Sequence, residues 1–269
     1  KHNYLVKTIE ELPHILQEAF YIARTGRPGP VHIDIPKDIT ATIGEWYRKE
    51  SFSMQTYKPT QKGNPRQIQK ALEAMREAVR PILYLGGGIV LSEASGEVRE
   101  LLSLTEIPVV ETLMARGVIP AGDKNLLGML GMHGTKTSNY GVTKCDLLIV
   151  LGARFSDRVT GNAAKFANNA KIVQIDVDAA EINKNVVVDA SVIGDVREVL
   201  RRLLEMIPEE QHPEWIEHIQ EMKAKYPLTY DHSQLTGPYI IEKLYEITKG
   251  DAIRSEERRV GKECLRLCR

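Results

Sequence analysis

The feature that most constrains the fold is an alternation of short apolar runs with longer segments of helical periodicity through the middle of the chain. The apolar runs lie at 82–85, 108–111, 147–151, 171–175 and 192–193, and the helical patterns lie at 67–79, 92–104 and 195–206. Apolar strands that alternate with helices are typical of a parallel sheet whose two faces are both covered. We therefore expect an α/β fold with a central parallel sheet and helices on both faces.

A smaller α/β unit precedes this region. A Thr-x-x-Glu capping box at 8–11 begins a helical pattern, in which Pro13 fits only in the first turn. A turn at 25–30 and an alternating strand at 31–35 follow. Periodicity is then lost at 40–64, where Pro, Lys, Gln and Gly accumulate, so we expect a linker between two domains there.

Beyond the middle region, further helical patterns lie at 212–226 and 236–248, and 250–253 resembles the start of a strand. The last segment, 254–269, has neither apolar periodicity nor turn chemistry, so we expect a tail that is not part of the fold, with a genuine basic tail as the alternative. The expected boundaries are 1–39 for the first domain, 40–64 for the linker, 65–207 for the central domain, 208–235 for a connecting segment, and 236–253 for the start of another domain.

The composition argues against several classes of protein. With 36 basic and 36 acidic residues the formal net charge is zero, which disfavours a strongly basic nucleic-acid-binding protein. No apolar stretch approaches the roughly 20 residues that span a bilayer, and we expect no membrane segment. Three cysteines cannot build a disulfide framework, so we expect a cytoplasmic protein.

In a parallel sheet, ligands bind at the carboxyl ends of the strands, so the loops at these ends are the candidate site. Gly86, Gly87 and Gly88 follow the first strand but do not continue into the G-x-G-x-x-G pattern of dinucleotide sites. They fit a tight turn as well as a phosphate-binding loop.

Two further loops are rich in small and flexible side chains. The segment 111–117 follows the second strand, and 127–134 carries a glycine at every third position, a spacing that lets a flat ligand approach the backbone. Met129 and Met132 supply polarizable contacts for such a ligand, although methionines in apolar loops more often serve in packing. For His133 we favour contact with the ligand over catalysis, because no nucleophile or carboxylate lies near it in sequence.

Charged side chains follow the next strands. Arg154 and Arg158 suit a diphosphate or a carboxylate, with a surface Arg–Asp pair through Asp157 as the alternative. Asp176 takes the place where ribose hydroxyls are commonly held, and Asp195 fits either the same role or a helix N-cap. Together the loops predict a site for an adenine dinucleotide.

The remaining candidates are weaker. Cys145 begins an apolar strand, which favours a packed thiol over a reactive one. Outside the tail there is no C-x-x-C or H-x-x-x-H pair, so we expect no zinc site.

Four motifs carry a resemblance to a known family: TGRPGPVHIDIPKD at 25–38, LGMHG at 130–134, GARFSDRVTG at 152–161 and GDV at 194–196. Together they resemble the large, catalytic subunit of acetolactate synthase, a thiamine-diphosphate-dependent enzyme. The likeness covers nearly all of the chain up to residue 253. It implies that 1–39 ends a pyrimidine-binding domain, that 65–207 is a Rossmann-like FAD-binding domain, and that 236–253 opens a diphosphate-binding domain.

The resemblance also implies an activity. The family decarboxylates pyruvate and condenses the product with a second 2-oxo acid, a step in valine, leucine and isoleucine biosynthesis, and its FAD undergoes no net redox change. The main ligands of thiamine diphosphate and Mg²⁺ would lie outside this chain, so the chain alone would be inactive. A homo-oligomer and a possible regulatory small subunit are the implied partners.

Site residues follow from the motifs position by position. Arg158 and Met132 resemble residues that shape the pocket of the second oxo acid, and Lys37 resembles a channel residue near it. Ser156 stands where many members have aspartate, so one acidic partner of the arginines is absent. The implied FAD contacts are Arg27, Gly86, Gly87, Gly88, Thr112, Leu113, Met114, Gly131, Met132, His133, Gly152, Arg154, Asp157, Asp176, Val177, Glu181, Gly194, Asp195 and Val196.

Three other interpretations remain: a nicotinamide dehydrogenase, a non-catalytic adenine-dinucleotide-binding module, and a different thiamine-diphosphate-dependent carboligase or decarboxylase. The broken glycine fingerprint and the lack of a catalytic acid–base pair count against the dehydrogenase.

Overall fold

A computed structural model describes residues 1–47, 52–207 and 212–252, and the chain divides into two compact units, Lys1–Tyr226 and Pro227–Arg269. The predicted tail at 254–269, with Cys264 and Cys268, lies outside the described residues.

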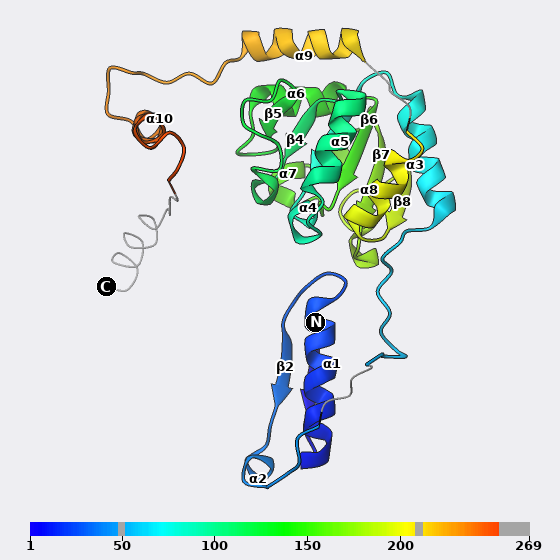
Figure 1. The fold of residues 1–269 in the computed structure, drawn as a ribbon. Coiled ribbons are helices and arrows are strands. Elements are labelled where there is room, and N and C mark those ends of the chain that lie inside the picture. The colour runs from blue at the N-terminus through cyan, green and yellow to red at the C-terminus, as the bar shows by residue number, and fades with distance from the viewer. Residues whose placement is uncertain (48–51, 208–211, 253–269) are drawn as a thin grey trace. The chain divides into compact units, whose positions relative to one another are not determined.

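The larger unit is built on a six-stranded parallel sheet with the order β5-β4-β3-β6-β7-β8 (Figure 1). Every neighbouring pair of strands is parallel. The strands are β3 (Pro81–Leu85), β4 (Val109–Glu111), β5 (Leu126–Met129), β6 (Leu147–Leu151), β7 (Lys171–Asp176) and β8 (Ala190–Ile193). The predicted fold class is therefore confirmed.

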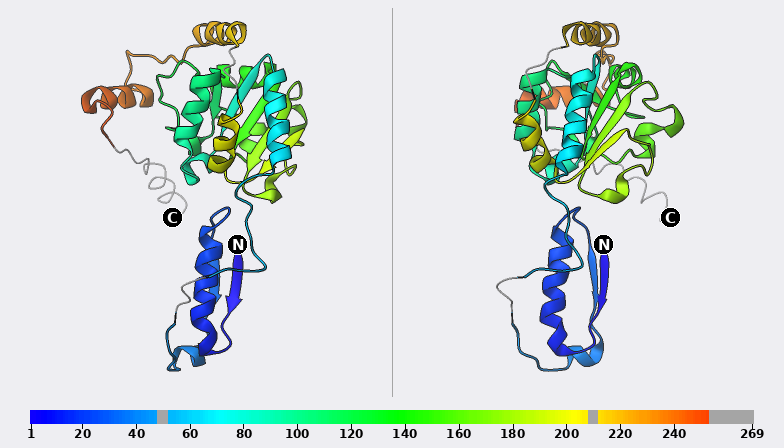
Figure 2. Two further views of the ribbon diagram at one scale, coloured as in Figure 1. Left: turned by 45° about the vertical axis from the view of Figure 1, so that its right-hand side comes forward. Right: turned by 90° about the vertical axis from the view of Figure 1, so that its right-hand side faces the viewer.

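Both faces of the sheet are covered, because successive side chains of each strand point to opposite sides. Leu83 and Leu85 of β3 join one apolar cluster, whereas Ile82 and Tyr84 join another. The first cluster packs under helices α3 (Pro65–Glu77), α4 (Gly88–Leu91), α5 (Ser95–Thr105) and α8 (Val196–Leu204), and the second under α6 (Lys136–Lys144) and α9 (Pro213–Lys225). Figure 2 shows helices on both sides of the sheet.

The strand order places a switch point between β3 and β6. The chain runs from β3 outward through β4 to β5 and then returns to add β6 on the other side of β3. The loops that follow β3 and β6 therefore diverge from one point at the carboxyl edge of the sheet. A crevice at such a point is where open α/β sheets bind ligands.

The first part of the chain has its own small sheet. Strands β1 (His2–Leu5) and β2 (Val31–Asp34) pair in parallel beside helix α1 (Leu12–Arg24), and α2 (Lys37–Thr40) follows. The predicted capping box at 8–11 is wrong, because Thr8 makes no side-chain capping bond and a single 3₁₀ turn, Ile9–Glu11, precedes α1. Pro13 does lie in the first turn of α1, as predicted.

The sequence patterns did not predict strands β1 and β5 or helix α6. The pattern at 127–134 predicted only a flexible loop, yet its first residues form the edge strand β5. Thr135 caps the start of α6, because its side chain accepts a hydrogen bond from the Ser138 amide. The remaining short helices are α7 (Asp157–Thr160) and the 3₁₀ turns η2 (Leu113–Ala115), η3 (Ala163–Lys165) and η4 (Ala179–Glu181).

In the second unit, α10 (Gly237–Thr248) is capped by Thr236, whose hydroxyl accepts a hydrogen bond from the Tyr239 amide. This confirms the capped helix predicted there. The strand expected at 250–253 is absent from its described part, since 250–252 form no strand, and residue 253 lies outside the described residues. Within the described ranges, none of the helices has both the length and the apolar character needed to cross a bilayer.

The central strand β6 tests the two-sided core. Ile149 is 1% exposed and pairs with Leu83 and Val173. We expect Ile149→Ala to lower the free energy of unfolding by about 2–5 kcal/mol, because the truncated side chain leaves a cavity that the neighbouring side chains do not fill completely. Urea unfolding measures this loss. Val79→Ala is the control, because Val79 is 67% exposed; losses of equal size in the two variants would contradict the buried position of Ile149.

Candidate active-site cavity

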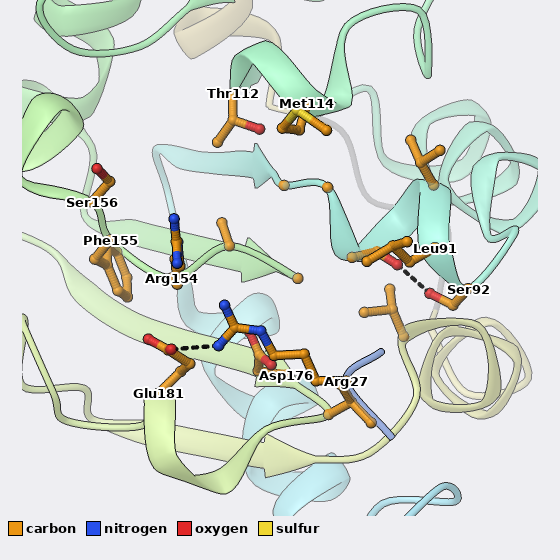
Figure 3. A pocket seen from close by; sticks show the side chains of 18 of the residues that line it. Arg27, Leu91, Ser92, Thr112, Met114, Arg154, Phe155, Ser156, Asp176 and Glu181 are labelled. Carbon is orange, nitrogen blue, oxygen red and sulfur yellow. Dashed lines mark hydrogen bonds and ion pairs between the residues drawn. The ribbon is translucent and has the colours of Figure 1, made fainter. Parts of the chain in front are cut away.

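A cavity of about 780 Å³ lies at the switch point, and it falls within the roughly 300–1,000 Å³ of small-molecule sites. Loops that follow all six strands of this sheet line it, together with Gln61 and the turn at 24–28. Figure 3 shows labelled side chains from several of these loops around one open space. The loops singled out in the sequence therefore converge.

Glycines let the loops that follow β3 and β6 meet backbone to backbone. The Gly86 amide donates to the Leu151 carbonyl at 2.9 Å, and the Gly88 amide donates to the Gly152 carbonyl at 3.0 Å. A Cβ on Gly86 would lie 2.2 Å from the Gly152 oxygen, which is too close for any side chain at this position. The glycine run thus serves close packing of two loops at the floor of the cavity, and all three glycines also line it.

Arginines without partners occupy one side. Both Arg154 and Arg158 line the cavity and are exposed. Neither guanidinium has an ion-pair partner within the ranges that the structure describes, and Asp157 instead accepts a hydrogen bond from the Ser156 hydroxyl at 3.1 Å. The alternative of an Arg–Asp surface pair is therefore wrong, and two positive charges face the cavity.

An acidic wall lies at the end of β7. Asp176 is 8% exposed, and its carboxylate accepts a hydrogen bond from the Asp178 amide at 2.9 Å. Arg27 donates to Asp178 at 3.1 Å and to Glu181 at 2.6 Å, as Figure 3 shows for Glu181. Asp178 also caps η4, because its carboxylate accepts a hydrogen bond from the Ala180 amide.

The pKa values of the two buried carboxyl groups of this wall, Asp176 and Glu181, are shifted in opposite directions. Burial raises the pKa of Asp176, and the negative charges of Asp178 and Glu181 add to that effect. The pKa of Glu181 is lowered instead, because hydrogen bonds from Arg27 and Lys184 outweigh the cost of burial. Arg27 therefore holds Glu181 ionised beside a carboxyl that resists ionisation.

Buried acceptors indicate room for a polar ligand. The Glu181 Oε2 and Thr112 Oγ1 atoms are both buried and have no hydrogen-bond partner among the described residues. Both residues line the cavity. A buried polar atom without a partner is costly, so a ligand that carries hydroxyl or amide groups fits here.

Large apolar side chains surround the opening. Leu91, Leu113 and Met114 line the cavity and are each more than 60% exposed. Clustered exposed apolar side chains of this kind commonly mark a binding surface, and thioether and aliphatic groups suit a flat aromatic ligand. The turn that carries Met114 is held by Glu111, which is buried and pairs with Arg116 at 3.2 Å.

Most of the expected cofactor residues line the cavity. These are Arg27, Gly86, Gly87, Gly88, Thr112, Leu113, Met114, His133, Gly152, Arg154, Asp176, Val177, Glu181, Asp195 and Val196, and the expected substrate residue Arg158 lines it as well. Asp195 is also the N-cap of α8, accepting from the Arg197 and Glu198 amides at 3.0 and 3.3 Å, which confirms that interpretation.

Five expected residues lie outside the lining. Gly131 packs against α7, since a Cβ there would lie 2.5 Å from Val159 Cα. Gly194 packs likewise against the Gln61 carbonyl. Met132 and Asp157 are exposed, and Lys37 begins α2 in the first part of the chain. Their ligand roles stay predictions.

Several lining residues were not foreseen. Tyr84 is the fourth residue of β3 and fully buried, so only its position one residue before the strand ends could have indicated it. Ser92, which ends α4 and donates to the Gly88 carbonyl, lay within a segment expected to be one helix. Gln61 belongs to the linker, where no pattern pointed to a site.

Cys145 lies away from the cavity. Burial raises the pKa of the Cys145 thiol to about 12, which confirms a packed rather than a reactive cysteine. Within the described ranges, no group of three or more His, Cys, Asp or Glu residues is placed to hold a metal ion.

The raised pKa of Asp176 predicts a pH-dependent cost. A carboxyl whose folded-state pKa lies above its unfolded value of about 4 destabilises the fold as pH rises through the folded pKa. We therefore expect Asp176→Asn to match the unchanged chain near pH 4 and to unfold at higher denaturant concentration from neutral pH upward. Chemical unfolding of the ligand-free chain between pH 4 and 8 measures this difference. Asp157→Asn is the matched control, and an unaltered pH dependence in Asp176→Asn would contradict the buried charge.

Comparison with known proteins agrees with this geometry. Residues 68–203 match the family model described as "Thiamine pyrophosphate enzyme, central domain". The acetolactate synthase of Mycobacterium bovis is 42% identical over 262 residues, covering 94% of this chain and 42% of the relative. The isozyme 3 large subunit of Escherichia coli acetolactate synthase is 39% identical over 94% of this chain and 46% of its own length.

An archaeal relative, the probable acetolactate synthase large subunit of Methanocaldococcus jannaschii, is 46% identical over 83% of this chain and 39% of its own length. The chain thus spans about two fifths of the length of these relatives. It belongs to the thiamine pyrophosphate enzyme family, whose central domain it contains, and it is similar over most of its length to acetolactate synthase large subunits.

Proposed function

We propose that the chain forms part of an acetolactate synthase large subunit and that its cavity binds FAD. The observation that supports this most directly is that one cavity at the switch point is lined by arginines without an ion-pair partner in the described part of the chain, by an acidic wall and by exposed apolar side chains. A flavin dinucleotide carries the three matching chemistries, namely a diphosphate, ribose and ribityl hydroxyls, and a flat aromatic ring.

The residues divide by chemistry. Arg154 suits the diphosphate, because guanidinium groups form strong charge-assisted hydrogen bonds with phosphate oxygens. Asp176 and Glu181 suit ribose hydroxyls, for which Glu181 Oε2 is free. Leu113 and Met114 suit the aromatic ring. When bound, FAD would stabilise the domain without a net redox change, as the family resemblance implies.

For the whole enzyme we propose decarboxylation of pyruvate and condensation with a second 2-oxo acid, with thiamine diphosphate and Mg²⁺ as further cofactors. Arg158 would bind the carboxylate of the second oxo acid with Met132 beside it, because the Met132 amide donates to the Arg158 carbonyl at 3.0 Å. Lys37 remains a proposed channel residue.

The expected domain boundaries, a homo-oligomer, a regulatory small subunit and a cytoplasmic location belong to the same proposal. The alternatives of a nicotinamide dehydrogenase and of a separate adenine-dinucleotide-binding module are not favoured, because the named relatives are acetolactate synthases.

Titration of the purified 269-residue chain with FAD and with NAD tests the cofactor. We expect FAD to bind saturably, with quenching of its fluorescence, and NAD to bind far more weakly. Stronger binding of NAD, or no binding of FAD to a folded chain, would overturn the flavin assignment. The longer protein, supplied with pyruvate, thiamine diphosphate and Mg²⁺, should produce acetolactate.

Replacing Arg154 tests the diphosphate contact. We expect Arg154→Ala to weaken FAD binding by about ten- to a hundred-fold, because a hydrogen bond to a charged group contributes roughly 1.5–3 kcal/mol. Arg201→Ala is the control, since Arg201 is likewise exposed but pairs with Glu97 away from the cavity. FAD affinities that fall equally in both variants would remove Arg154 from the site.

Replacing Arg158 in the longer enzyme tests the second substrate. We expect Arg158→Ala to reduce condensation more than decarboxylation, because only the second oxo acid would lose its carboxylate partner. Pyruvate consumption and acetolactate yield, measured together, separate the two steps. If both rates drop by the same factor, Arg158 does not bind the second oxo acid.

A further inference from the structure

The loop that carries Arg154 is held in an unfavourable backbone conformation. Phe155 has a φ of 52°, in the left-handed region that non-glycine residues rarely adopt. Its ring is 1% exposed and packs 6.2 Å from the Tyr84 ring and 5.8 Å from the Phe166 ring, measured between centroids. Strained residues persist only where the surrounding structure holds them, and they cluster at functional sites.

Two side-chain amides hold this loop. Gln174 Nε2 donates to the Ala153 carbonyl at 3.1 Å, and Asn185 Nδ2 donates to the Arg154 and Phe155 carbonyls at 3.2 and 3.0 Å. Three consecutive carbonyl groups are therefore bound by protein donors. We call the two residues, Gln174 and Asn185, the amide clamp.

Gln174 is otherwise unexplained. It is fully buried on β7 among apolar neighbours, and its Oε1 atom has no hydrogen-bond partner among the described residues. Burying an amide costs free energy unless it is hydrogen-bonded. The bond to the Ala153 carbonyl therefore offsets part of the cost of a polar side chain at this position.

The clamp has an electrostatic consequence for the cavity. A carbonyl oxygen carries partial negative charge and would repel a phosphate. The oxygens of 153–155 accept hydrogen bonds from these two side-chain amides, so less of their negative charge is available to oppose a phosphate. The guanidinium of Arg154, labelled in Figure 3, lies among the side chains of the cavity. The same bonds fix the backbone from which the Arg154 side chain extends.

We propose that Asn185 and Gln174 are positioning residues of the cavity: by binding the carbonyls of 153–155 they hold Phe155 in its left-handed conformation and direct Arg154 at the diphosphate of the cofactor. The diphosphate part rests on the proposed flavin function. Neither amide side chain lines the cavity, so both act through the loop.

The test replaces Asn185, which is exposed and can change without opening the core. Asn185→Asp keeps the size of the side chain but places a carboxylate, which cannot donate, against two carbonyl oxygens. Asn169→Asp is the matched control, because Asn169 Nδ2 also donates to a backbone carbonyl, that of Thr143 at 3.3 Å, away from the cavity loop. Gln174→Met provides a second variant of the clamp.

Hydrogen exchange of the ligand-free chain reports the loop directly. We expect the amides of 153–159 to exchange at least ten-fold faster in Asn185→Asp than in the unchanged chain, and at the unchanged rate in Asn169→Asp. Unaltered exchange in Asn185→Asp and Gln174→Met would overturn the clamp whether or not the chain binds flavin.

Titration with FAD then tests the action through Arg154. We expect Asn185→Asp to weaken binding about ten-fold and Asn169→Asp to leave it unchanged. In the Arg154→Ala background the same Asn185 change should have less than a three-fold effect, because residues that act through one contact are not additive. Additive losses would overturn the positioning role. Failure of the unchanged chain to bind FAD would overturn the proposed function alone, since the exchange measurement still decides the clamp.

Discussion

The contact on which the rest of this structure depends is the approach of two backbone loops at the centre of the sheet. Gly86 and Gly88 lie directly against Gly152, and their amides donate hydrogen bonds to the Leu151 and Gly152 carbonyls at the end of β6. Because β3 and β6 are neighbours whose connections leave in opposite directions, the space above this contact is open on both sides. A Cβ at either glycine would separate the loops, and the floor of the cavity would be lost.

Above that floor the cavity is divided by charge. The loop that follows β6 carries Arg154 and Arg158, which have no ion-pair partner among the described residues, and buried carboxylates lie at the end of β7. Arg27 reduces the repulsion between the carboxylates of Asp178 and Glu181, because its guanidinium binds both of them. A ligand with a negative centre and hydroxyl groups beside it would complement both sides, which is the physical content of the flavin proposal.

Much of this arrangement was predictable from the sequence, and the reasons are specific. The apolar runs of β3, β6 and β7 are buried on both faces, so their strand character was evident without tertiary information. Since carboxyl ends of parallel strands share one edge, the convergence of Gly86, Arg154 and Asp176 followed directly.

The features that were missed depend on contacts distant in sequence. Strand β5 contains Gly128 and ends in a glycine-rich stretch, so its strand character comes from pairing with β4 and not from local propensity. The clamp residues Gln174 and Asn185 showed no motif, because their partners lie 21 to 31 residues earlier in the chain. The lining role of Gln61 likewise depends on how the linker passes the Asp195 amide, to which its carbonyl binds at 2.8 Å.

The ion pairs of Arg27 also bear on the order of events during synthesis. Arg27 precedes Asp178 by 151 residues and Glu181 by 154. A ribosome therefore delivers the guanidinium long before either acceptor exists, and every strand from β3 to β7 is translated in between. Nascent chains that end before Asp178 leave Arg27 without its two carboxylates, so the wall of the cavity cannot be completed until the chain has been translated through Glu181.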